Sequence, residues 1–320
     1  MLVFSEAFHT SYQYSLAVAM PDVDWFFVHG FWGKNRPKPH NVHETQDRPL
    51  EQYDVFLSHH PEQFFHMRNA LIEHGINPSK LVYVSHWGVP HQELWKSKYF
   101  GKSIEQFVKD VSYHPIVSVS HFILHDYKFY SHIINEAIPH FVPMELFHGA
   151  EWQPGGTHYI NIVVAFFQHL RGAGAEFWSQ LDDNKVPRSI YGPMNEGRAA
   201  GELETSDDLI DLASKSRGYI WTGDYVAMSF APLECMACGL PMIAPDNMDW
   251  SKFFTHRENI LLYKHRDVQS LYQTVSEFEA DEGLQKRLSI AGRDVIADKF
   301  GVNPFRARWM RVLDAASSAR

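Results

Sequence analysis

Residues 229–245 have the composition of a helix that can hold an anion at its start. Pro232 suits the first turn of a helix, where a missing backbone N–H has no cost, and Gly239 suits the left-handed residue that ends one. Amides at the start of a helix lack partners within it, and the helix dipole is positive there. The segment therefore predicts a site for an anion such as a diphosphate.

Cys235 and Cys238 lie in the same segment, with the C-x-x-C spacing that zinc and redox sites use. A structural zinc site needs four ligands, usually from a second such pair, and the chain has two cysteines in total. We therefore expect both thiols to pack inside a helix. Because two cysteines cannot build a disulfide framework, the composition is typical of a reducing cytoplasm, where we expect the protein to act.

Several of the 20 histidines are close enough in sequence to share a site. His121 and His125 have the i, i+4 spacing of metal ligands on a helix, but no Glu completes an H-E-x-x-H motif. We expect no metal site here. His59 and His60 follow one strand-like segment and His86 ends another, which places them at the sheet edge where ligands bind.

Charge is spread evenly along the chain, which carries a net charge of −9. Residues 1–150 hold 11 Lys and Arg against 15 Asp and Glu, giving −4, and the remainder holds 18 against 23, giving −5. Neither half is a basic platform for nucleic acid or anionic lipid, so a nucleic-acid acceptor is disfavoured. No apolar run reaches the roughly 18 residues of a membrane span, so we expect no integral membrane segment.

The elements that must position these residues alternate along the first half of the chain. Short apolar segments typical of buried strands are separated by segments with helical spacing, which predicts a parallel sheet with helices on both faces. The expected strands are 2–5, 25–29, 55–58, 81–85 and 116–120, and the expected helices are 63–74 and 120–137.

A Gly- and Pro-rich segment at 153–156 is typical of a linker, and the alternation restarts after it. The length suits two domains, which we place at 1–150 and 151–302, with a final helix at 303–320 expected to pack back on the first. The expected strands are 159–165, 188–191, 218–221 and 241–244, and the expected helices are 177–181, 205–214, 232–238, 267–280, 282–299 and 303–316. Two such units are expected to form a ligand cleft at the carboxyl ends of their strands.

Residues 229–245, which read SFAPLECMACGLPMIAP, resemble the donor-site helix and following strand of the twin-Rossmann (GT-B) glycosyltransferases, in particular the family-4-like group. Weaker similarities to that group extend over most of the chain, at 53–60, 81–88, 117–120 and 257–263. The resemblance implies an α/β fold in which two Rossmann-like domains face each other across a cleft, the first on the acceptor side and the second binding a nucleotide-sugar.

The resemblance also implies roles for individual residues. Glu234 would accept hydrogen bonds from the ribose hydroxyls, Arg171 would neutralise the diphosphate leaving group, and His86 would face the transferred sugar; these three are the expected catalytic residues. A simpler interpretation of Glu234 is an acid favoured by the helix dipole. Further donor contacts are expected from Gly192, Pro193, Thr222, Gly223, Asp224, Ser229, Phe230 and Ala231, acceptor contacts from His9, His59 and His60, and weaker phosphate contacts from Lys185 and Arg188.

The chain departs from the group's pattern at the acidic pair, which is two Glu eight positions apart. Val226 occupies the first position and Glu234 the second, and Asp224 is out of register by two. Phe166 lies where the group has an Arg, and Arg171 lies where it has a Lys. Residues 6–14 replace the usual Gly-Gly loop.

The resulting expectation is metal-independent transfer of a hexose or deoxyhexose from a UDP-, GDP- or dTDP-sugar to a hydroxyl of a carbohydrate, lipid-linked or small-molecule acceptor. The resemblance implies retention of anomeric configuration; an inverting reaction would need a base, for which His86 or His59 would serve. No cofactor beyond the donor is expected. The alternatives are a sugar-nucleotide epimerase or hydrolase, a weakly active or non-catalytic partner of a transferase, and a transferase acting on modified nucleic acid.

Overall fold

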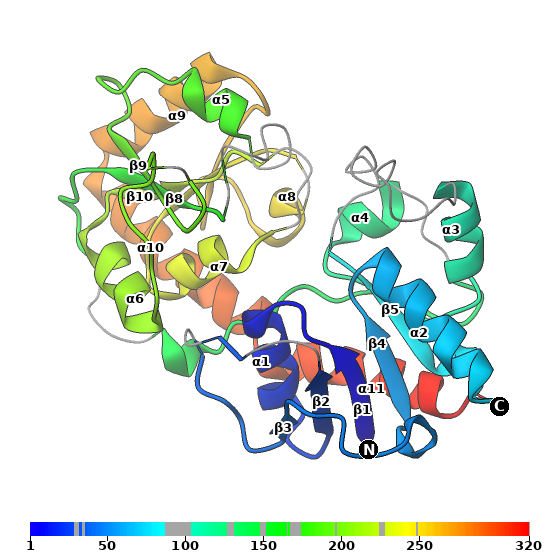
Figure 1. Ribbon diagram of the computed structural model, residues 1–320. Helices are drawn as coiled ribbons and strands as arrows, with labels where there is room; N and C mark the ends of the chain where they lie inside the picture. Colours follow the sequence, from blue (N-terminus) through cyan, green and yellow to red (C-terminus); the bar gives the residue numbers. More distant parts are fainter. Residues whose placement is uncertain are drawn as a thin grey trace. The chain divides into compact units, whose positions relative to one another are not determined.

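The computed structural model describes the whole chain apart from a few segments, and it divides into two compact units (Figure 1). Unit 1 comprises Met1–Phe141 and Val302–Arg320, and unit 2 comprises Val142–Gly301. The boundary lies at Val142, whereas the sequence placed it at 151, and both chain termini lie in unit 1. The segments not described are 29–31, 34–35, 87–103, 127–130, 148–151, 165, 167–173, 196, 224–227, 248 and 320.

Unit 1 is built on a seven-stranded sheet in the order β3-β2-β1-β4-β5-β6-β7, in which every neighbouring pair is parallel. From β1 the chain adds strands first on one side and then on the other, so the direction of winding reverses between β1 and β4. Ligand sites form at such a reversal in open α/β sheets. The strands are β1 (Leu2–Glu6), β2 (Asp24–Val28), β3 (Val42–His43), β4 (Val55–Ser58), β5 (Leu81–Ser85), β6 (Ile116–Ser118) and β7 (Asn135–Ala137).

The helices of unit 1 differ from the sequence-based prediction in several places: α1 (Thr10–Ala19) and α3 (Ile104–Val111) were not predicted, and a third difference lies at 120–137. A single helix was expected over 120–137, but α4 ends at Asp126 and β7 occupies the end of that range. Pairing of Glu136 with Val117 on β6 extends the sheet, and this long-range contact outweighs the local helical pattern. The helices described in unit 1 are α1 (Thr10–Ala19), α2 (Pro61–Glu73), α3 (Ile104–Val111), α4 (His121–Asp126) and α11 (Val302–Ser317).

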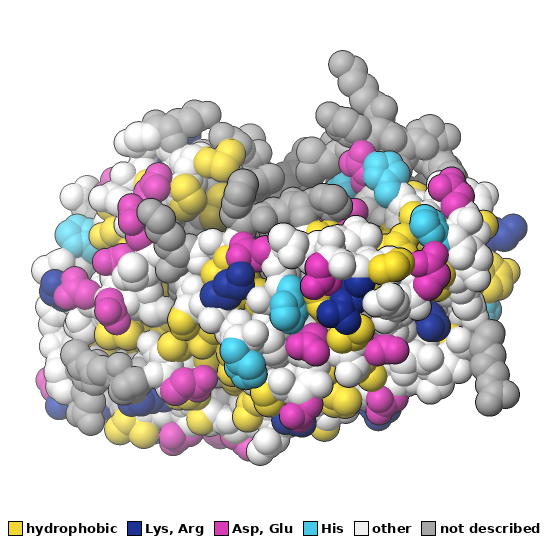
Figure 2. All heavy atoms as spheres, turned by 60° about the horizontal axis from the view of Figure 1, so that its bottom comes forward, with side chains coloured by type: hydrophobic (Ala, Val, Ile, Leu, Met, Phe, Trp, Pro, Cys, Tyr) yellow, Lys and Arg dark blue, Asp and Glu magenta, His cyan; other side chains and the backbone are white. Residues whose placement is uncertain are grey.

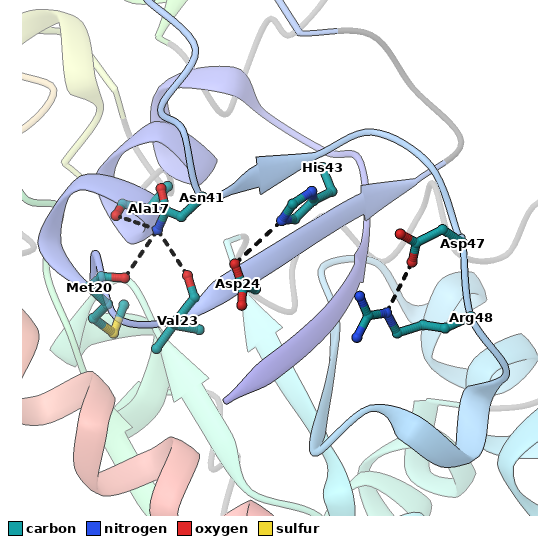
Figure 3. A network of polar contacts seen from close by, with 8 residues as sticks. All are labelled: Ala17, Met20, Val23, Asp24, Asn41, His43, Asp47 and Arg48. Carbon is teal, nitrogen blue, oxygen red and sulfur yellow. Dashed lines mark hydrogen bonds and ion pairs between the residues drawn. The ribbon is translucent and has the colours of Figure 1, made fainter.

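A buried asparagine joins α1 to the edge of this sheet (Figure 3). The side-chain amide of Asn41 donates to the carbonyl oxygens of Ala17, Met20 and Val23 at 2.9–3.2 Å. These carbonyls lie at the end of α1 and in the turn that leads to β2, where helical partners are absent. Asn41 therefore fixes the end of α1 against β2, while the start of α1 faces the carboxyl end of β1.

The last helix, α11, packs on unit 1 beside α1 (Figure 1). An apolar stripe on this helix is buried: Phe305, Trp309 and Leu313 are each less than 4 % exposed. Burial of side chains this large contributes about 1.5–3 kcal/mol each. Two polar contacts to β7 also orient α11. Arg311 forms an ion pair with Glu136, and Arg308 donates a hydrogen bond to the carbonyl oxygen of Ala137 at 2.9 Å.

Unit 2 contains a five-stranded parallel sheet in the order β12-β11-β10-β8-β9. Here the winding reverses between β8 and β10. The strands are β8 (Tyr159–Ile162), β9 (Arg188–Tyr191), β10 (Gly218–Ile220), β11 (Met242–Pro245) and β12 (Leu261–Tyr263). The helices described are α5 (Ala175–Ser179), α6 (Ser206–Lys215), α7 (Phe230–Ala237), α8 (Trp250–Phe253), α9 (Val268–Ala280) and α10 (Glu282–Lys299).

The predicted start of α6 is confirmed in detail. The Thr205 side chain accepts from the Asp208 backbone N–H, and the Asp208 carboxylate accepts from the Thr205 N–H at 2.8 Å, which is a reciprocal capping box. Two parallel α/β sheets confirm the predicted fold class. Within the described part of the chain, every helix is too short or too polar to cross a bilayer.

Candidate functional site

The carboxyl ends of β8 and β10 hold the loops that flank the reversal in unit 2. Asn161 on β8 is fully buried, and its amide nitrogen lies 3.5 Å from the hydroxyl of Thr222, which follows β10. The Tyr219 hydroxyl donates to Asn161 at 2.9 Å and accepts from the Ile162 backbone N–H at 2.9 Å. These hydrogen bonds thus fix the positions at which the loops after β8 and β10 begin.

Gly174 shows how closely the two loops approach each other. A Cβ at this position would lie 1.8 Å from the carbonyl oxygen of Thr222, and Gly174 has a left-handed φ of 78°. Only glycine fits both the conformation and the contact. The predicted donor residue Thr222 is therefore held against the end of the loop that follows β8.

Asn195 joins the loops after β8 and β9. Its side-chain oxygen Oδ1 accepts from the Phe166 N–H at 2.7 Å. Its side-chain nitrogen Nδ2 donates to the backbone carbonyls of Val163 and Gly192 at 3.0 and 2.8 Å. Gly192 has a φ of 122°, and a Cβ there would lie 2.7 Å from the Val163 carbonyl oxygen. The loop that holds the predicted donor residues Gly192 and Pro193 is thus joined by hydrogen bonds to the loop that follows β8. Asn195 was not predicted as a site residue; its position three residues after a glycine at a strand end is the only signal in the sequence.

The helix α7 begins at Phe230, after the β10 loop, and carries the predicted ribose ligand. Glu234 is the fifth residue of α7 and is 4 % exposed. Glu234 lies beyond the first turn of α7, where an acid gains little from the helix dipole. Its role in ribose recognition stays a prediction.

The start of α7 holds three of the predicted donor residues, Ser229, Phe230 and Ala231. Ser229 occupies the N-cap position, but its side chain makes no capping hydrogen bond to the described residues. Phe230 is buried and Ala231 is partly buried. Just before this segment, Gly223 lies on the indole of Trp221, where a Cβ would approach within 2.7 Å of the ring.

Three predicted positions lie outside the described residues: Arg171, Asp224 and Val226. Two weaker phosphate candidates are described, and both lie at the other end of the sheet. Arg188 begins β9, forms an ion pair with Asp183 and lies over the Trp178 ring at 5.4 Å, while Lys185 lies over the Tyr272 ring at 4.8 Å. The structure does not support diphosphate binding by Arg188 or Lys185, because both lie at the amino end of β9, whereas the loops at the reversal follow the carboxyl ends of β8 and β10.

In unit 1 the predicted histidines gather at the carboxyl ends of neighbouring strands. His9 follows β1 and precedes α1, His59 and His60 follow β4, and His86 follows β5. Since β1, β4 and β5 are adjacent and parallel, their ends meet at one sheet edge, on both sides of the reversal. The structure thus brings together residues that are distant in sequence.

His59 and His86 are directly hydrogen-bonded. The Nδ1 atom of His59 lies 3.0 Å from Nε2 of His86, and Nε2 of His59 lies 3.1 Å from the hydroxyl oxygen of Ser5. Phe8 stacks on both imidazoles, with ring centroids 5.1 and 4.5 Å away. Burial lowers the pKa of His59 to about 3, and burial together with neighbouring His59 holds the pKa of His86 well below its usual value. Both rings are therefore neutral at neutral pH.

Two further residues, missed by the sequence analysis, complete this cluster. Tyr12 from α1 contacts His86 edge-on at 4.7 Å, and it also packs against His140 at 5.8 Å and Trp309 at 6.4 Å. Burial lowers the pKa of His140 to about 3. No local sequence pattern indicates these contacts, because His140 and Tyr12 are brought together by the sheet.

His9 and His60 differ from the two buried imidazoles. His9 is exposed. His60 is partly buried and caps α2, since its Nδ1 accepts from the Glu62 N–H at 3.2 Å. An acceptor role for His9, His59 and His60 stays a prediction. His59 is fully buried, and its ring is hydrogen-bonded to that of His86 at the carboxyl ends of the strands.

The cysteines behave as packing residues. Cys235 and Cys238 are buried in and directly after α7 and are not disulfide-bonded. Burial raises the pKa of both thiols, that of Cys238 to about 12, so neither is a reactive thiolate. Across the described residues, His, Cys, Asp and Glu side chains form no group of three suited to a metal ion. His125 lies in α4, and its side chain is not described.

The surface carries charges of both signs in close mixture. Figure 2 shows basic and acidic side chains interspersed on one face, with no extended basic area. This agrees with the even negative balance of the sequence.

Comparison with known proteins assigns the fold. Sucrose-phosphate synthase from Thermosynechococcus elongatus is similar over 98 % of both chains, with a TM-score of 0.69 at 13 % identity. HepE from Anabaena, in complex with UDP and glucose, is similar over 98 % of this chain and 99 % of its own, with a TM-score of 0.67 at 11 % identity. The chain has the GT-B glycosyltransferase fold. The lipopolysaccharide outer core galactosyltransferase WaaB is a further GT-B neighbour, with a TM-score of 0.64 at 10 % identity over 98 % of this chain and 99 % of its own.

A family match covers part of the GT-B chain. Residues 172–303 match the family described as glycosyl transferase-like, and this range includes the loop after β10, α7 and Glu234. No curated protein matches the chain in sequence. The predicted resemblance to GT-B glycosyltransferases is confirmed, and the family match and fold together support sugar transfer.

Proposed function

We propose that this GT-B chain transfers a hexose or deoxyhexose from a nucleotide-diphosphate donor to an acceptor hydroxyl. The observation that carries the proposal is the place of Glu234. It is a buried carboxylate on α7, inside the segment that matches the glycosyl transferase-like family and next to the loops at the reversal in unit 2.

In this proposal unit 2 binds the donor. A buried carboxylate accepts two hydrogen bonds well, which suits the paired ribose hydroxyls of a nucleotide. Backbone amides around Ser229 and the guanidinium of Arg171 would stabilise the diphosphate as negative charge develops on it. Gly192, Pro193, Thr222, Gly223 and Asp224 would surround the nucleotide.

Unit 1 carries the acceptor side, with His86 at the transferred sugar. UDP is the first donor nucleotide to test because HepE is described in complexes with UDP and with UDP-glucose. Stabilisation of the diphosphate by amides and a guanidinium supplies what a metal ion would otherwise supply, so we propose a metal-independent reaction. Retention of configuration is proposed from the resemblance to the family-4-like group.

Calorimetry of the full chain with UDP, GDP, dTDP and their sugars tests this proposal directly. We expect one nucleotide to bind with 1:1 stoichiometry in the presence of EDTA. Absence of binding by every nucleotide would contradict it and would favour a non-catalytic partner of a transferase.

A bound donor must then be consumed with an acceptor present. Product analysis of the binding donor with and without carbohydrate acceptors separates the remaining alternatives. Release or isomerisation of the sugar with no acceptor would show a hydrolase or epimerase and would overturn the transferase proposal.

A further inference from the structure

The hydrogen bonds around His59 form a continuous series that runs through three side chains of unit 1. Ser5 lies on β1, His59 follows β4 and His86 follows β5, and the ring of His59 bridges the other two. Ser5 and His59 are fully buried, so water does not supply alternative partners there. The direction of each bond is therefore decided by the donors and acceptors within the series.

The direction is set at the Ser5 end. The Ser5 hydroxyl lies 3.0 Å from the Glu6 carbonyl oxygen, and a carbonyl only accepts, so the single hydroxyl hydrogen points to Glu6. The Ser5 oxygen then accepts from Nε2–H of His59, which leaves Nδ1 of neutral His59 without a hydrogen. His86 must in turn donate its Nε2–H to that Nδ1.

The opposite direction satisfies fewer contacts. If His59 donated from Nδ1 to His86, its Nε2 would accept the Ser5 hydrogen. The Ser5 and Glu6 oxygens would then face each other at 3.0 Å as two acceptors, and that contact would hold no hydrogen, although the Glu6 carbonyl also accepts from Nε2 of Gln13 at 3.3 Å. In the first direction all three contacts are hydrogen bonds: Ser5 donates to Glu6, His59 donates to Ser5, and His86 donates to His59.

We propose that Ser5 and His59 are positioning residues that fix neutral His86 in the tautomer with its proton on Nε2. Nδ1 of His86 is then an acceptor, which can receive a hydrogen bond from a hydroxyl group and cannot donate one. The tautomer follows from the hydrogen-bond geometry alone, whereas its use at a transferred sugar rests on the proposed function.

The surroundings of the two imidazoles hold the series in place. Phe8 stacks on both rings and Tyr12 contacts both edge-on, so both imidazoles are packed between aromatic neighbours. The titratable neighbours are His9 and Tyr12 from the segment after β1, and His140 beyond β7.

Nitrogen-15 NMR of histidine rings in the ligand-free full chain tests the tautomer. Signals of His86 are identified by their loss in His86→Gln. We expect Nε2 of His86 to carry a directly coupled proton and Nδ1 to carry none. A wild-type spectrum with the proton on Nδ1 of His86 overturns the proposal on its own, whatever the variants do.

Ser5→Ala removes the hydroxyl that sets the direction. We expect His86 to become a mixture of both tautomers in this variant, while Ser5→Thr, which keeps a hydroxyl, retains the wild-type state. An unchanged His86 tautomer in folded Ser5→Ala would also contradict the proposal. If Ser5→Ala does not fold, His59→Asn and His59→Phe take its place: the amide oxygen of Asn can accept from His86, and Phe cannot.

Ser15→Ala is the matched control. Ser15 is equally buried in unit 1 and donates to the carbonyls of Ser11 and Phe141, outside the series. Its loss should leave the His86 signals in place. Because these measurements need no donor and no turnover, they can fail while the proposed sugar transfer holds, and the reverse is also possible.

Discussion

At the scale of single residues, the proposed donor recognition depends most on Glu234. It is buried on α7, beyond the first turn of the helix, inside the segment that matches the glycosyl transferase-like family. Asn195 is the second such residue, because three hydrogen bonds of one side chain join two loops.

Glu234→Gln should weaken nucleotide binding while keeping the shape of the side chain. Hydrogen bonds to a charged acceptor contribute about 1.5–3 kcal/mol, so the Kd measured by calorimetry should rise about 10- to 100-fold. Glu258→Ala, at an exposed position of the same unit, is the control and should bind as the wild type does. Unchanged affinity in folded Glu234→Gln would remove the ribose role.

Arg171→Ala should lower turnover more than it lowers stability. Removal of one group that stabilises developing negative charge costs on the order of 100-fold in kcat. Steady-state kinetics and a thermal melt on the same sample check both halves of this expectation. Lys185→Ala removes a cation that lies over the Tyr272 ring, and kinetics like those of the wild type are expected. Equal kcat for Arg171→Ala and wild type would exclude Arg171 from the site.

At the scale of elements, both units place their candidate residues where the direction of winding of a parallel sheet reverses. In unit 2 the loops after β8, β9 and β10 are joined by Asn195 and by the contact of Gly174 with Thr222. In unit 1 the ends of β1, β4 and β5 meet at the histidine cluster. The strands therefore hold the loops in place, and the loops carry the candidate recognition residues.

Gly174→Ala tests whether the loop contact in unit 2 matters for the donor. The new Cβ would meet the Thr222 carbonyl at 1.8 Å, so the loops must separate. Gly155→Ala is a matched control, because Gly155 also has a positive φ, of 120°, but a Cβ there meets nothing within 4 Å.

Both alanine variants should lose about 1–3 kcal/mol of stability from backbone strain. Only Gly174→Ala should lose additional stability and weaken nucleotide binding, as measured by urea unfolding and calorimetry. Equal effects of the two substitutions would show that the contact is not important.

At the scale of the whole molecule, the buried histidines make stability depend on pH, and they lie in unit 1. The folded-state pKa values of His59 and His140 are about 3, whereas an unfolded histidine titrates near 6.5. Between these values the unfolded chain binds protons that the folded chain does not. The free energy of unfolding therefore falls as the pH falls from about 6.5 towards 3.

Urea unfolding at pH 7 and pH 5 should show this loss in unit 1, at up to about 1.4 kcal/mol per pH unit for each buried histidine. His140→Gln should reduce the slope with pH. His158→Gln, at an exposed position of unit 2, should not. A free energy of unfolding that stays constant between pH 7 and pH 5 would contradict the assignment of neutral, buried imidazoles.

The sequence alone determined those features that local patterns carry. Alternation of apolar and helical segments predicted two parallel α/β units, and the Pro232–Gly239 spacing predicted α7, because both signals need only neighbours in the chain. It also indicated that His59 and His86 end strands. It misassigned 120–137 as one helix because pairing of β7 with β6 depends on a partner strand.

The tertiary structure alone decided which of these residues meet. Ser5, His59 and His86 are separated by 54 and 27 positions, and they share hydrogen bonds because parallel strands bring their carboxyl ends to one edge. The same holds for Asn195 and Phe166, 29 positions apart. No local propensity encodes such contacts, since the free energy that forms them comes from burial of whole strands against one another.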